Sequence, residues 1–326
     1  MCELAHTLQH VAGPIGFPFH MAEFAPTDAP TEPAPKIQHT CVCGNTRCQH
    51  CGWGGCGLKR REASHLTGLP SLARARVWFK FPELVWGSEG AGKMLEVLGN
   101  FNSMDGITAQ FGPAGSKALG KAEFLAAVEW PDRSNEFTHC LLVIADDIPS
   151  LKAYLHSDFH LVDWMAAVGP FAKGIVVFDS DLALTLAPGD ETILHTALFK
   201  MPGVVDGDAA HIAMCEVVAQ FNDVPGVRAS FQRAGNAALS KDELLEAVSW
   251  PDKAFGFTHL LTVVCDDAAA LKVYLHGDAH KAWVGVAGPN MSGEPRSLIF
   301  DTPLLLSAAP SALRPTVGPA PKIQHS

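Results

Sequence analysis

The chain has 326 residues, of which 48% are hydrophobic and 18% charged, a composition typical of globular proteins, and its length predicts about two domains. The net charge is -10 and the basic residues form no long stripe, which argues against nucleic acid as a partner. No apolar run approaches the roughly 20 residues needed to cross a bilayer, so we expect a soluble protein that does not span a membrane.

The N-terminal residues and the cysteines indicate a reducing compartment. The chain lacks the charged start and apolar core of a secretory signal, and three of its nine cysteines lie inside apolar segments, where they behave as small hydrophobic residues. We therefore expect a cytoplasmic protein. A basic stretch between Lys59 and Arg76 leaves the chloroplast or another organelle open as an alternative.

Residues 1–72 are rich in Pro, Gly, His and Cys and show no sustained period, which predicts a mostly irregular extension. Four thiolates in this extension have spacings that allow a tetrahedral, structural zinc site. They are Cys43, Cys48, Cys51 and Cys56. The alternative is a flexible, redox-sensitive tail, because the two well-separated Cys-x-x-Cys pairs of a zinc ribbon are missing. We expect no cofactor beyond this zinc.

The first repeat, residues 73–182, alternates strand and helix patterns. We predict strands at 77–81, 107–111, 138–145 and 174–179, and helices over 93–101 and from Asp146-Asp147 through Tyr154. This order, β-α-β-β-α-β, is the split pattern of ferredoxin-like units. An extra helix precedes the third strand, and it begins at Gly120 in the first repeat but at the capping box Ser240-Lys241-Asp242-Glu243 in the second.

A second repeat, residues 195–306, follows a linker at 183–194 and copies the first 120 positions later. Roughly half of the positions match without a change of register, which indicates a tandem duplication. The matching residues include Phe79 and Phe199, Trp130 and Trp250, His139 and His259, Tyr154 and Tyr274, and His160 and His280. We interpret the two tryptophans as aromatic anchors that fasten the extra helix over the core.

Residues 307–326 form a Pro-rich tail, and Pro33–His39 recurs in it as Pro319–His325. This repeated peptide is the one hint of a protein-interaction role.

The clearest strand of each repeat is apolar on both faces. Along Phe137, His139, Leu141 and Val143 the side chains point one way, and the residues between them point the other way. A sheet of this kind must be covered twice, once by its own helices and once by a second sheet. We therefore predict an α+β fold in which the two ferredoxin-like repeats form an intramolecular dimeric α/β-barrel, and a monomeric chain that resembles a dimer.

The strand Phe-Thr-His, the acidic helix start and the Tyr-x5-His spacing resemble the stress-responsive A/B barrel (Dabb) family in both repeats. The opening strand of repeat 2 at His195 also resembles that family, whereas repeat 1 has Ala75 there. The resemblance implies a ferredoxin-like unit that pairs into a barrel. Members include a polyketide cyclase that makes olivetolic acid, and its catalytic groups match His139, Tyr154, His160, His259, Tyr274 and His280.

Imidazole and phenol suit the removal of a carbon-bound proton and the binding of an enolate oxygen, so these six residues are the catalytic candidates. We expect His195, Phe79 and Phe199 to contact a ligand. The alternative is that the histidines and tyrosines are satisfied core residues. His156, Asp158 and His160 also allow a metal site, but we interpret Asp158 as a helix cap.

Three functions stay open. The first is a stress-response protein of undefined activity that binds a small hydrophobic molecule inside the barrel. The second is a cyclase-like enzyme that uses His and Tyr acid-base chemistry. The third is a protein-interaction scaffold. An open cavity at the histidines and tyrosines would favour the enzyme, and a barrel filled by side chains would favour the scaffold.

Overall fold

The computed structural model describes residues 73–181, 191–236 and 238–305. Both repeats belong to one compact unit of the chain. The predicted zinc ligands and the repeated Pro-Ala-Pro-Lys-Ile-Gln-His peptides lie outside the described residues.

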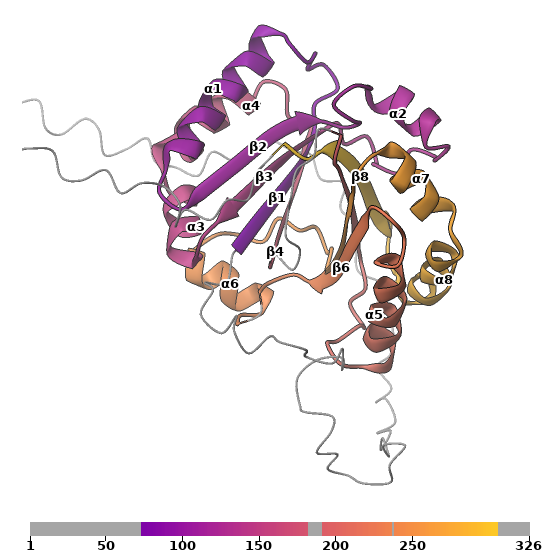
Figure 1. Cartoon of the computed structure of the whole chain (residues 1–326). Coiled ribbons are helices and arrows are strands. Elements are labelled where there is room, and N and C mark those ends of the chain that lie inside the picture. Colours follow the sequence, from indigo (N-terminus) through magenta and orange to yellow (C-terminus); the bar gives the residue numbers. More distant parts are fainter. Residues whose placement is uncertain (1–72, 182–190, 237, 306–326) are drawn as a thin grey trace, which may run out of the picture. The chain divides into compact units, whose positions relative to one another are not determined.

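Each repeat forms one four-stranded antiparallel sheet with the strand order of a ferredoxin-like unit, β2-β3-β1-β4 and β6-β7-β5-β8 (Figure 1). Repeat 1 contains β1 (Ala73–Lys80), α1 (Glu89–Ser103), β2 (Ile107–Pro113), α2 (Lys121–Ala127), β3 (His139–Ala145), α3 (Ile148–Leu155), a π-helical segment (Phe159–Trp164), α4 (Met165–Val168) and β4 (Gly174–Asp181). Repeat 2 contains β5 (Ile193–Phe199), α5 (Ala209–Phe221), β6 (Val227–Arg233), α6 (Lys241–Val248), β7 (His259–Cys265), α7 (Ala268–His276), α8 (Asp278–Ala287), a short 3-10 helix (Gly288–Asn290) and β8 (Ser297–Pro303). The predicted α+β, ferredoxin-like class is confirmed.

The helix starts follow the predicted caps. The Asp147 carboxylate accepts a hydrogen bond from the Ser150 amide at the start of α3 (2.8 Å). Ser240 and Glu243 form a complete capping box on α6. Gly120 offers no side-chain acceptor to α2, so this helix begins with its first amides uncapped.

Both faces of each sheet are buried, as the alternation in the strands predicts. Leu141 and Val143 of β3 face the helices of their own repeat, whereas Cys140, Leu142 and Ile144 face the other sheet. The space between the sheets is occupied by buried side chains. They include Trp78, Phe178, Leu198, Leu260 and Phe300.

The two sheets of the predicted dimeric α/β-barrel face each other and remain separate sheets. Their edges meet through two symmetric backbone hydrogen bonds, from the Gly115 amide to Asp301 O (2.9 Å) and from the Gly235 amide to Asp179 O (3.0 Å). No continuous ladder forms there, because both glycines have positive φ angles, of 119° and 106°, and the chain turns away toward α2 and α6.

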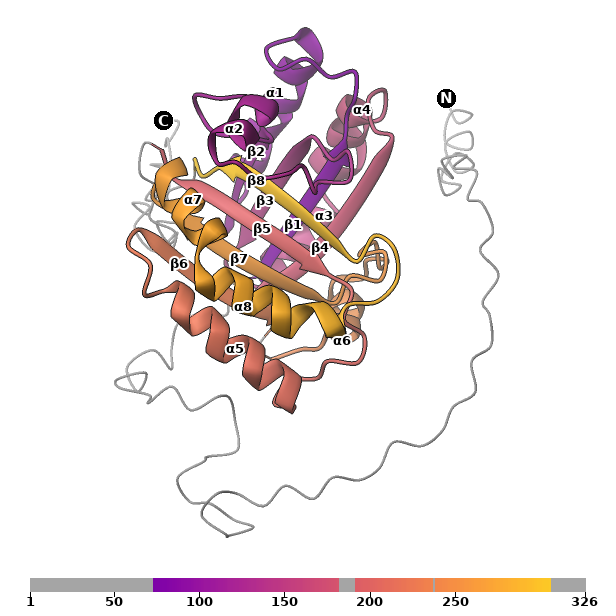
Figure 2. The ribbon, with the colours of Figure 1, turned by 90° about the vertical axis from the view of Figure 1, so that its right-hand side faces the viewer.

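The extra helix of each repeat covers the core of the other repeat. Phe124 and Val128 of α2 are buried in the repeat 2 core, and Leu244 and Val248 of α6 are buried in the repeat 1 core. Figures 1 and 2 show the helices on the outer faces of the two sheets, and in Figure 1 α2 lies beside α7 and α6 beside α3. The repeats therefore share helices as well as a sheet interface.

The histidines that follow the two tyrosines hold these shared helices. His156 Nε2 lies 2.8 Å from the Val248 carbonyl oxygen at the end of α6, and His276 Nε2 lies 3.0 Å from the Val128 carbonyl oxygen at the end of α2. Each imidazole donates to an oxygen that has no partner within its own helix.

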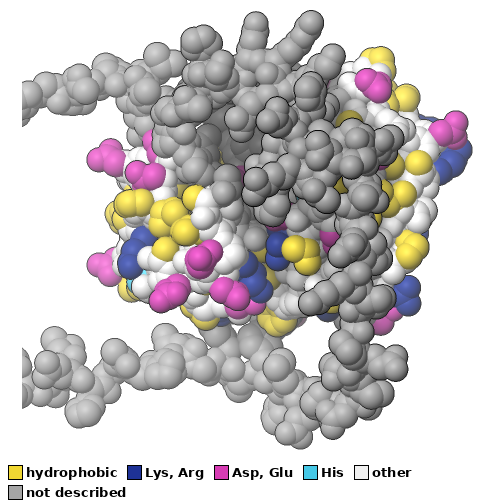
Figure 3. Space-filling view, turned by 90° about the horizontal axis from the view of Figure 1, so that it is seen from below, with side chains coloured by type: hydrophobic (Ala, Val, Ile, Leu, Met, Phe, Trp, Pro, Cys, Tyr) yellow, Lys and Arg dark blue, Asp and Glu magenta, His cyan; other side chains and the backbone are white. Residues whose placement is uncertain are grey.

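No helix in the described ranges combines the length and apolar character needed to cross a membrane. On the face shown in Figure 3, acidic and basic side chains are interspersed with apolar ones.

One cation lies between the two sheets. Arg76 is 1% exposed, and its guanidinium donates to Ser180 Oγ (3.0 Å) in its own sheet and to Thr262 Oγ1 (3.1 Å) in the opposite sheet. Its Nε has no acceptor within the described part of the chain, and burial lowers the pKa of Arg76 to about 10. The side chain thus joins the sheets while its charge stays without a carboxylate partner among the described residues.

We predict that the substitution R76M raises the free energy of unfolding by about 1–4 kcal/mol, because methionine fills a similar volume without the cost of burying a charge. Urea unfolding of the full chain measures this value. The control is R228M at a surface arginine, which should change stability by no more than about 0.5 kcal/mol. A loss of stability in R76M larger than in the control would show that the two hydroxyl contacts outweigh the desolvation of the charge.

Candidate functional site

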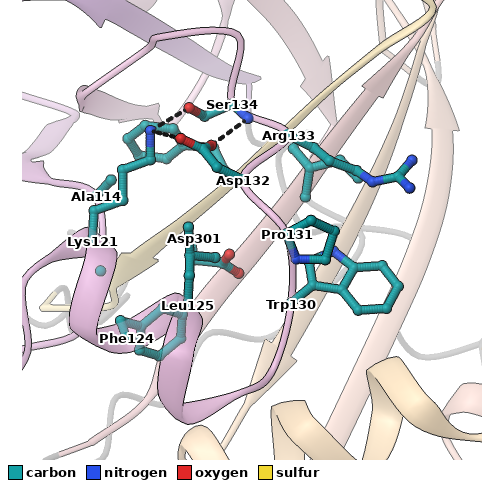
Figure 4. Close-up of a pocket in the computed structure, with 13 residues that line it drawn as sticks. Ala114, Lys121, Phe124, Leu125, Trp130, Pro131, Asp132, Arg133, Ser134 and Asp301 are labelled. Atoms are coloured by element: carbon teal, nitrogen blue, oxygen red, sulfur yellow. Dashed lines mark hydrogen bonds and ion pairs between the residues drawn. The ribbon is translucent and has the colours of Figure 1, made fainter.

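A small pocket lies where α2 of repeat 1 meets β8 of repeat 2 (Figure 4). Lys121, Phe124 and Leu125 line it from α2, and Ile299, Phe300 and Asp301 line it from β8. The segment from Trp130 to Ser134 closes a further wall, with Asp132 held by Lys121. The pocket has room for about one water molecule in this state.

A histidine-carboxylate pair lies behind the pocket. The Asp301 carboxylate lies on the pocket wall, and His195 Nδ1 donates to its Oδ1 at 2.7 Å. Both side chains are buried, at 1% exposure for His195 and 7% for Asp301. The pair forms because residues 195 and 301 are directly opposite each other in the antiparallel register of β5 and β8. The carboxylate orients the imidazole and fixes which nitrogen carries the proton.

Tyr274 and His280 complete this cluster from α7 and α8. The Tyr274 ring lies 5.6 Å from the His195 ring and 5.2 Å from the His280 ring, centroid to centroid. The Tyr274 hydroxyl is buried and has no hydrogen-bond partner among the described residues. It is therefore a free donor in an apolar setting, which is costly unless a ligand or water accepts from it.

The surroundings of His280 and Tyr274 keep both side chains neutral. Burial, with His195, Arg133 and His276 nearby, lowers the pKa of His280 to about 4. Burial raises the pKa of Tyr274 well above its usual value. Near neutral pH the cluster thus holds an unprotonated imidazole next to a protonated phenol.

Trp130 covers the cluster from the other repeat. Its ring lies 5.2 Å from the His280 ring and 5.9 Å from the His276 ring. Its Nε1 is buried without an acceptor among the described residues. The predicted anchoring role for Trp130 and Trp250 fits their positions, although each ring packs on the opposite repeat.

Repeat 1 carries an incomplete copy of the same cluster. Tyr154 and His160 are 4.9 Å apart between ring centroids, and Trp250 lies 5.2 Å from His160. Asp179 occupies the place of Asp301, but the residue opposite it in the register is Ala75. Burial, with the charge of Asp252 nearby, raises the pKa of Asp179 to about 7. The imidazole that pairs with the carboxylate in repeat 2 has no counterpart.

The strand histidines lie elsewhere in the helix-facing core. His139 stacks on Phe111 at 5.5 Å, and His259 stacks on Phe231 at 5.2 Å. Aromatic contacts through Phe231, Trp283 and Phe221 connect His259 to Tyr274, so these rings lie between the two. The structure brings each predicted tyrosine to the second histidine, and it places the strand histidine in a separate aromatic group.

Phe79 and Phe199 also face the helices and not the space between the sheets. Phe79 packs on Phe81 and Trp164, and Phe199 packs on Trp283. Their side chains form part of the cores that support the two clusters. Contact of these two residues with a ligand stays a prediction, and their placement excludes the space between the sheets as the location.

The metal interpretation of the second helix gains no support. The described residues contain no group of three or more His, Cys, Asp or Glu side chains placed to hold a metal ion. The alternative that Asp158 caps a helix with its side chain is also wrong, since its carboxylate makes no capping hydrogen bond. Ser157 caps this segment instead, since its Oγ accepts a hydrogen bond from the His160 amide (3.2 Å).

Asp301 is the site residue that the sequence pattern failed to identify. It stands in the apolar run Leu298–Thr302, where a carboxylate within a buried strand is itself unusual. Only the pairing of β5 with β8 shows that a histidine from a distant segment lies opposite.

No family model matches the sequence, and no curated protein matches it. A search of solved structures finds weakly similar chains. They include an anthrone oxidase-like protein (15% identity, TM-score 0.44, 71% of this chain and 91% of that chain covered), a hydroxynitrile lyase from Passiflora edulis (18%, 0.28, 36% and 99%) and a dimeric ferredoxin-like protein of unknown function from Thermobifida fusca (13%, 0.26, 34% and 92%). At these identities and scores the similarities carry no argument about activity.

We predict an acid-sensitive fold. Burial lowers the pKa of His139, His259 and His280 to about 4 each, whereas an exposed histidine in the unfolded chain titrates near about 6.5. The unfolded state therefore binds up to three more protons between these values, and stability is present above about pH 6.5 and lost as the pH falls toward about 4. The raised pKa of Asp179 opposes this loss with one proton.

Denaturant unfolding at a series of pH values measures how many protons the chain takes up when it unfolds. The double variant H139Q/H259Q should reduce the uptake by about two protons relative to the original chain. An unchanged pH dependence would mean that the two strand histidines are not buried in their neutral form.

Proposed function

We propose that this chain is a stress-response A/B barrel type protein that binds a small carbonyl compound at the His195–Asp301–Tyr274–His280 cluster of repeat 2 and moves a proton on its α-carbon. The observation that carries the proposal is the buried pair of His195 and Asp301, joined at 2.7 Å, of which Asp301 lines a pocket. Near it lies the Tyr274 hydroxyl, which has no partner among the described residues.

The chemistry follows from the protonation states. Neutral His280 accepts the proton from the carbon next to the carbonyl group. The electron pair of that C–H bond forms the C=C bond of the enolate, and the π pair of the carbonyl group moves onto its oxygen. The Tyr274 hydroxyl donates a hydrogen bond to this oxygen and stabilises the developing charge. Return of a proton from His280 to carbon restores the carbonyl compound, so the step needs no cofactor.

His195 acts as a second polar contact for the ligand. Its Nδ1 is engaged by Asp301, so Nε2 is the ring nitrogen left to contact a ligand. A ligand at the pocket would lie against the carboxylate wall and the aromatic ring of Trp130. This supports a small ligand with one polar and one flat apolar part.

Only repeat 2 is proposed to be active. Ala75 removes the imidazole from the repeat 1 cluster, and Asp179 then has no base opposite it in the register. Repeat 1 therefore supplies a control for every substitution in repeat 2.

The variants Y274F and H280Q should each lower proton exchange at the central carbon of acetylacetone in D2O at least about tenfold, because general acid-base groups contribute about 10²–10⁴-fold. Proton NMR follows the exchange rate above the buffer background. The matched controls Y154F and H160Q in repeat 1 should keep the full rate. Equal losses in both repeats, or no acceleration by the original chain, would refute the proposal.

The pH dependence provides an independent test. With a pKa of about 4, His280 is unprotonated throughout the neutral range, so the enzyme-catalysed rate should stay level from about pH 6 to 8 and fall only as the pH approaches about 4. A base with the ordinary histidine pKa of about 6.5 would instead give a rising rate between about pH 6 and 7. Steady-state kcat measurements at matched ionic strength distinguish the two.

A second candidate function, an interaction scaffold, is favoured by one observation. The space between the two sheets is occupied by large buried side chains such as Trp78, Phe178 and Phe300. A hydrophobic ligand therefore has to bind on the helix side of a sheet. Failure of the exchange experiment would leave the scaffold as the better-supported function.

A further inference from the structure

The pocket between α2 and β8 is too small for an organic ligand. It has room for about one water molecule, whereas the smallest diketone has several non-hydrogen atoms. A ligand can reach the cluster only if one wall moves. This inference rests on the proposed function for the identity of the ligand, and the movement itself follows from the walls of the pocket.

The pocket walls differ in how they are held. Ile299 and Asp301 belong to β8, which is paired along its whole length with β5. Trp130 and Arg133 lie on a segment that is fastened to β8 by a hydrogen bond from the Ile299 amide to the Arg133 carbonyl oxygen (3.0 Å). The remaining wall is the first part of α2, where Lys121, Phe124 and Leu125 line the pocket.

The C-terminal end of α2 is anchored. The carbonyl oxygen of Val128 accepts from His276, and Glu129 forms an ion pair with Lys272 at 2.8 Å. Both partners belong to α7 of repeat 2. This end of the helix can therefore act as a pivot.

The N-terminal end of α2 has no side-chain cap. Gly120 stands at the cap position without a side-chain acceptor, and Gly115 precedes it at a φ of 119°. The equivalent helix α6 carries the complete Ser240–Glu243 capping box. Ion pairs Lys121–Asp132 and Lys241–Asp252 tether both helices, and Lys121 also donates to Ser134 Oγ and to the Phe137 carbonyl oxygen. The side-chain cap is the contact that α6 has and α2 lacks.

The difference in capping between α2 and α6 coincides with the difference between the two polar clusters. The uncapped helix α2 covers repeat 2, which has the complete cluster, and the capped helix α6 covers repeat 1, which lacks the imidazole. We propose that α2 is a lid on the repeat 2 site, contributed by repeat 1, which opens at its N-terminal end about the anchor at Val128 and Glu129.

Trp130, on the fixed wall beyond the pivot, provides a donor for binding. Its Nε1 donor is buried without an acceptor among the described residues, and the Tyr274 hydroxyl is likewise buried without a partner there. Both rings pack on His280. Two unsatisfied donors around one imidazole suit a ligand that presents a hydrogen-bond acceptor, which is the property of a carbonyl or enolate oxygen.

A single substitution tests the lid. Gly120 has a φ of -63° and a ψ of 165°, almost the same backbone as Ser240, and a Cβ at this position meets no atom within 4 Å. Glu123 already stands three residues later, so G120S recreates the Ser-x-x-Glu capping box of α6 without other change. The variant G120A is the control for loss of glycine flexibility without a cap.

Hydrogen-deuterium exchange of the full chain measures the opening directly. The α2 amides should exchange faster than the α6 amides, and G120S should slow the α2 amides about fivefold, in line with the usual value of an N-cap. S240G should speed α6 and leave α2 unchanged. Equal protection of α2 and α6 in the original chain, or no slowing in G120S beyond that in G120A, would overturn the lid.

Exchange kinetics of the same variants test the lid and the proposed chemistry separately. In G120S, kcat/KM for acetylacetone exchange should fall by the same factor as the opening of α2, while S240G should leave it unchanged. W130F should raise KM, and W250F in repeat 1 should not. If α2 opens as expected but neither the original chain nor any variant exchanges acetylacetone, the proposed chemistry is refuted and the lid is retained. If G120S exchanges acetylacetone at an unaltered rate, the lid is refuted and the chemistry is retained.

Discussion

The packing of one apolar sheet face against another is the constraint on which this structure depends. Each β3-type strand is buried on both sides, so neither repeat could expose its inner face to water without a large cost. The duplicated chain meets this constraint by pairing its own two sheets. Because the inner space is then filled by side chains, any chemistry is displaced to the outer faces, between sheet and helices.

The sharing of helices strengthens this pairing and also shapes the sites. Each cluster contains a tyrosine and a histidine from one repeat and a tryptophan from the other. A change in one repeat therefore alters the environment of both clusters. The anchor histidines His156 and His276, at the ends of the shared helices, couple the arrangement of the two halves.

The two halves keep one fold while their buried polar clusters differ. Repeat 2 retains His195 opposite Asp301, whereas repeat 1 has Ala75 opposite Asp179. The aromatic contacts are nearly the same in both repeats. The tyrosine and histidine rings pack on each other, and the histidine ring packs on Trp130 in one cluster and on Trp250 in the other. One half thus carries the complete set of polar groups and the other supplies its cover.

Periodicity and duplication along the chain were enough to determine the element order, the two repeats, the burial of both strand faces and the capping difference between Gly120 and Ser240, because these features depend on residues close in sequence. The proximity of each tyrosine to its second histidine was implied by a six-residue spacing on helices. The pairing of His195 with Asp301, the position of Trp130 over the opposite repeat and the separation of His139 and His259 from the tyrosines came only from the tertiary structure. These relations join distant segments, such as the 106 residues between His195 and Asp301, and they depend on sheet register and helix sharing, which no local pattern encodes.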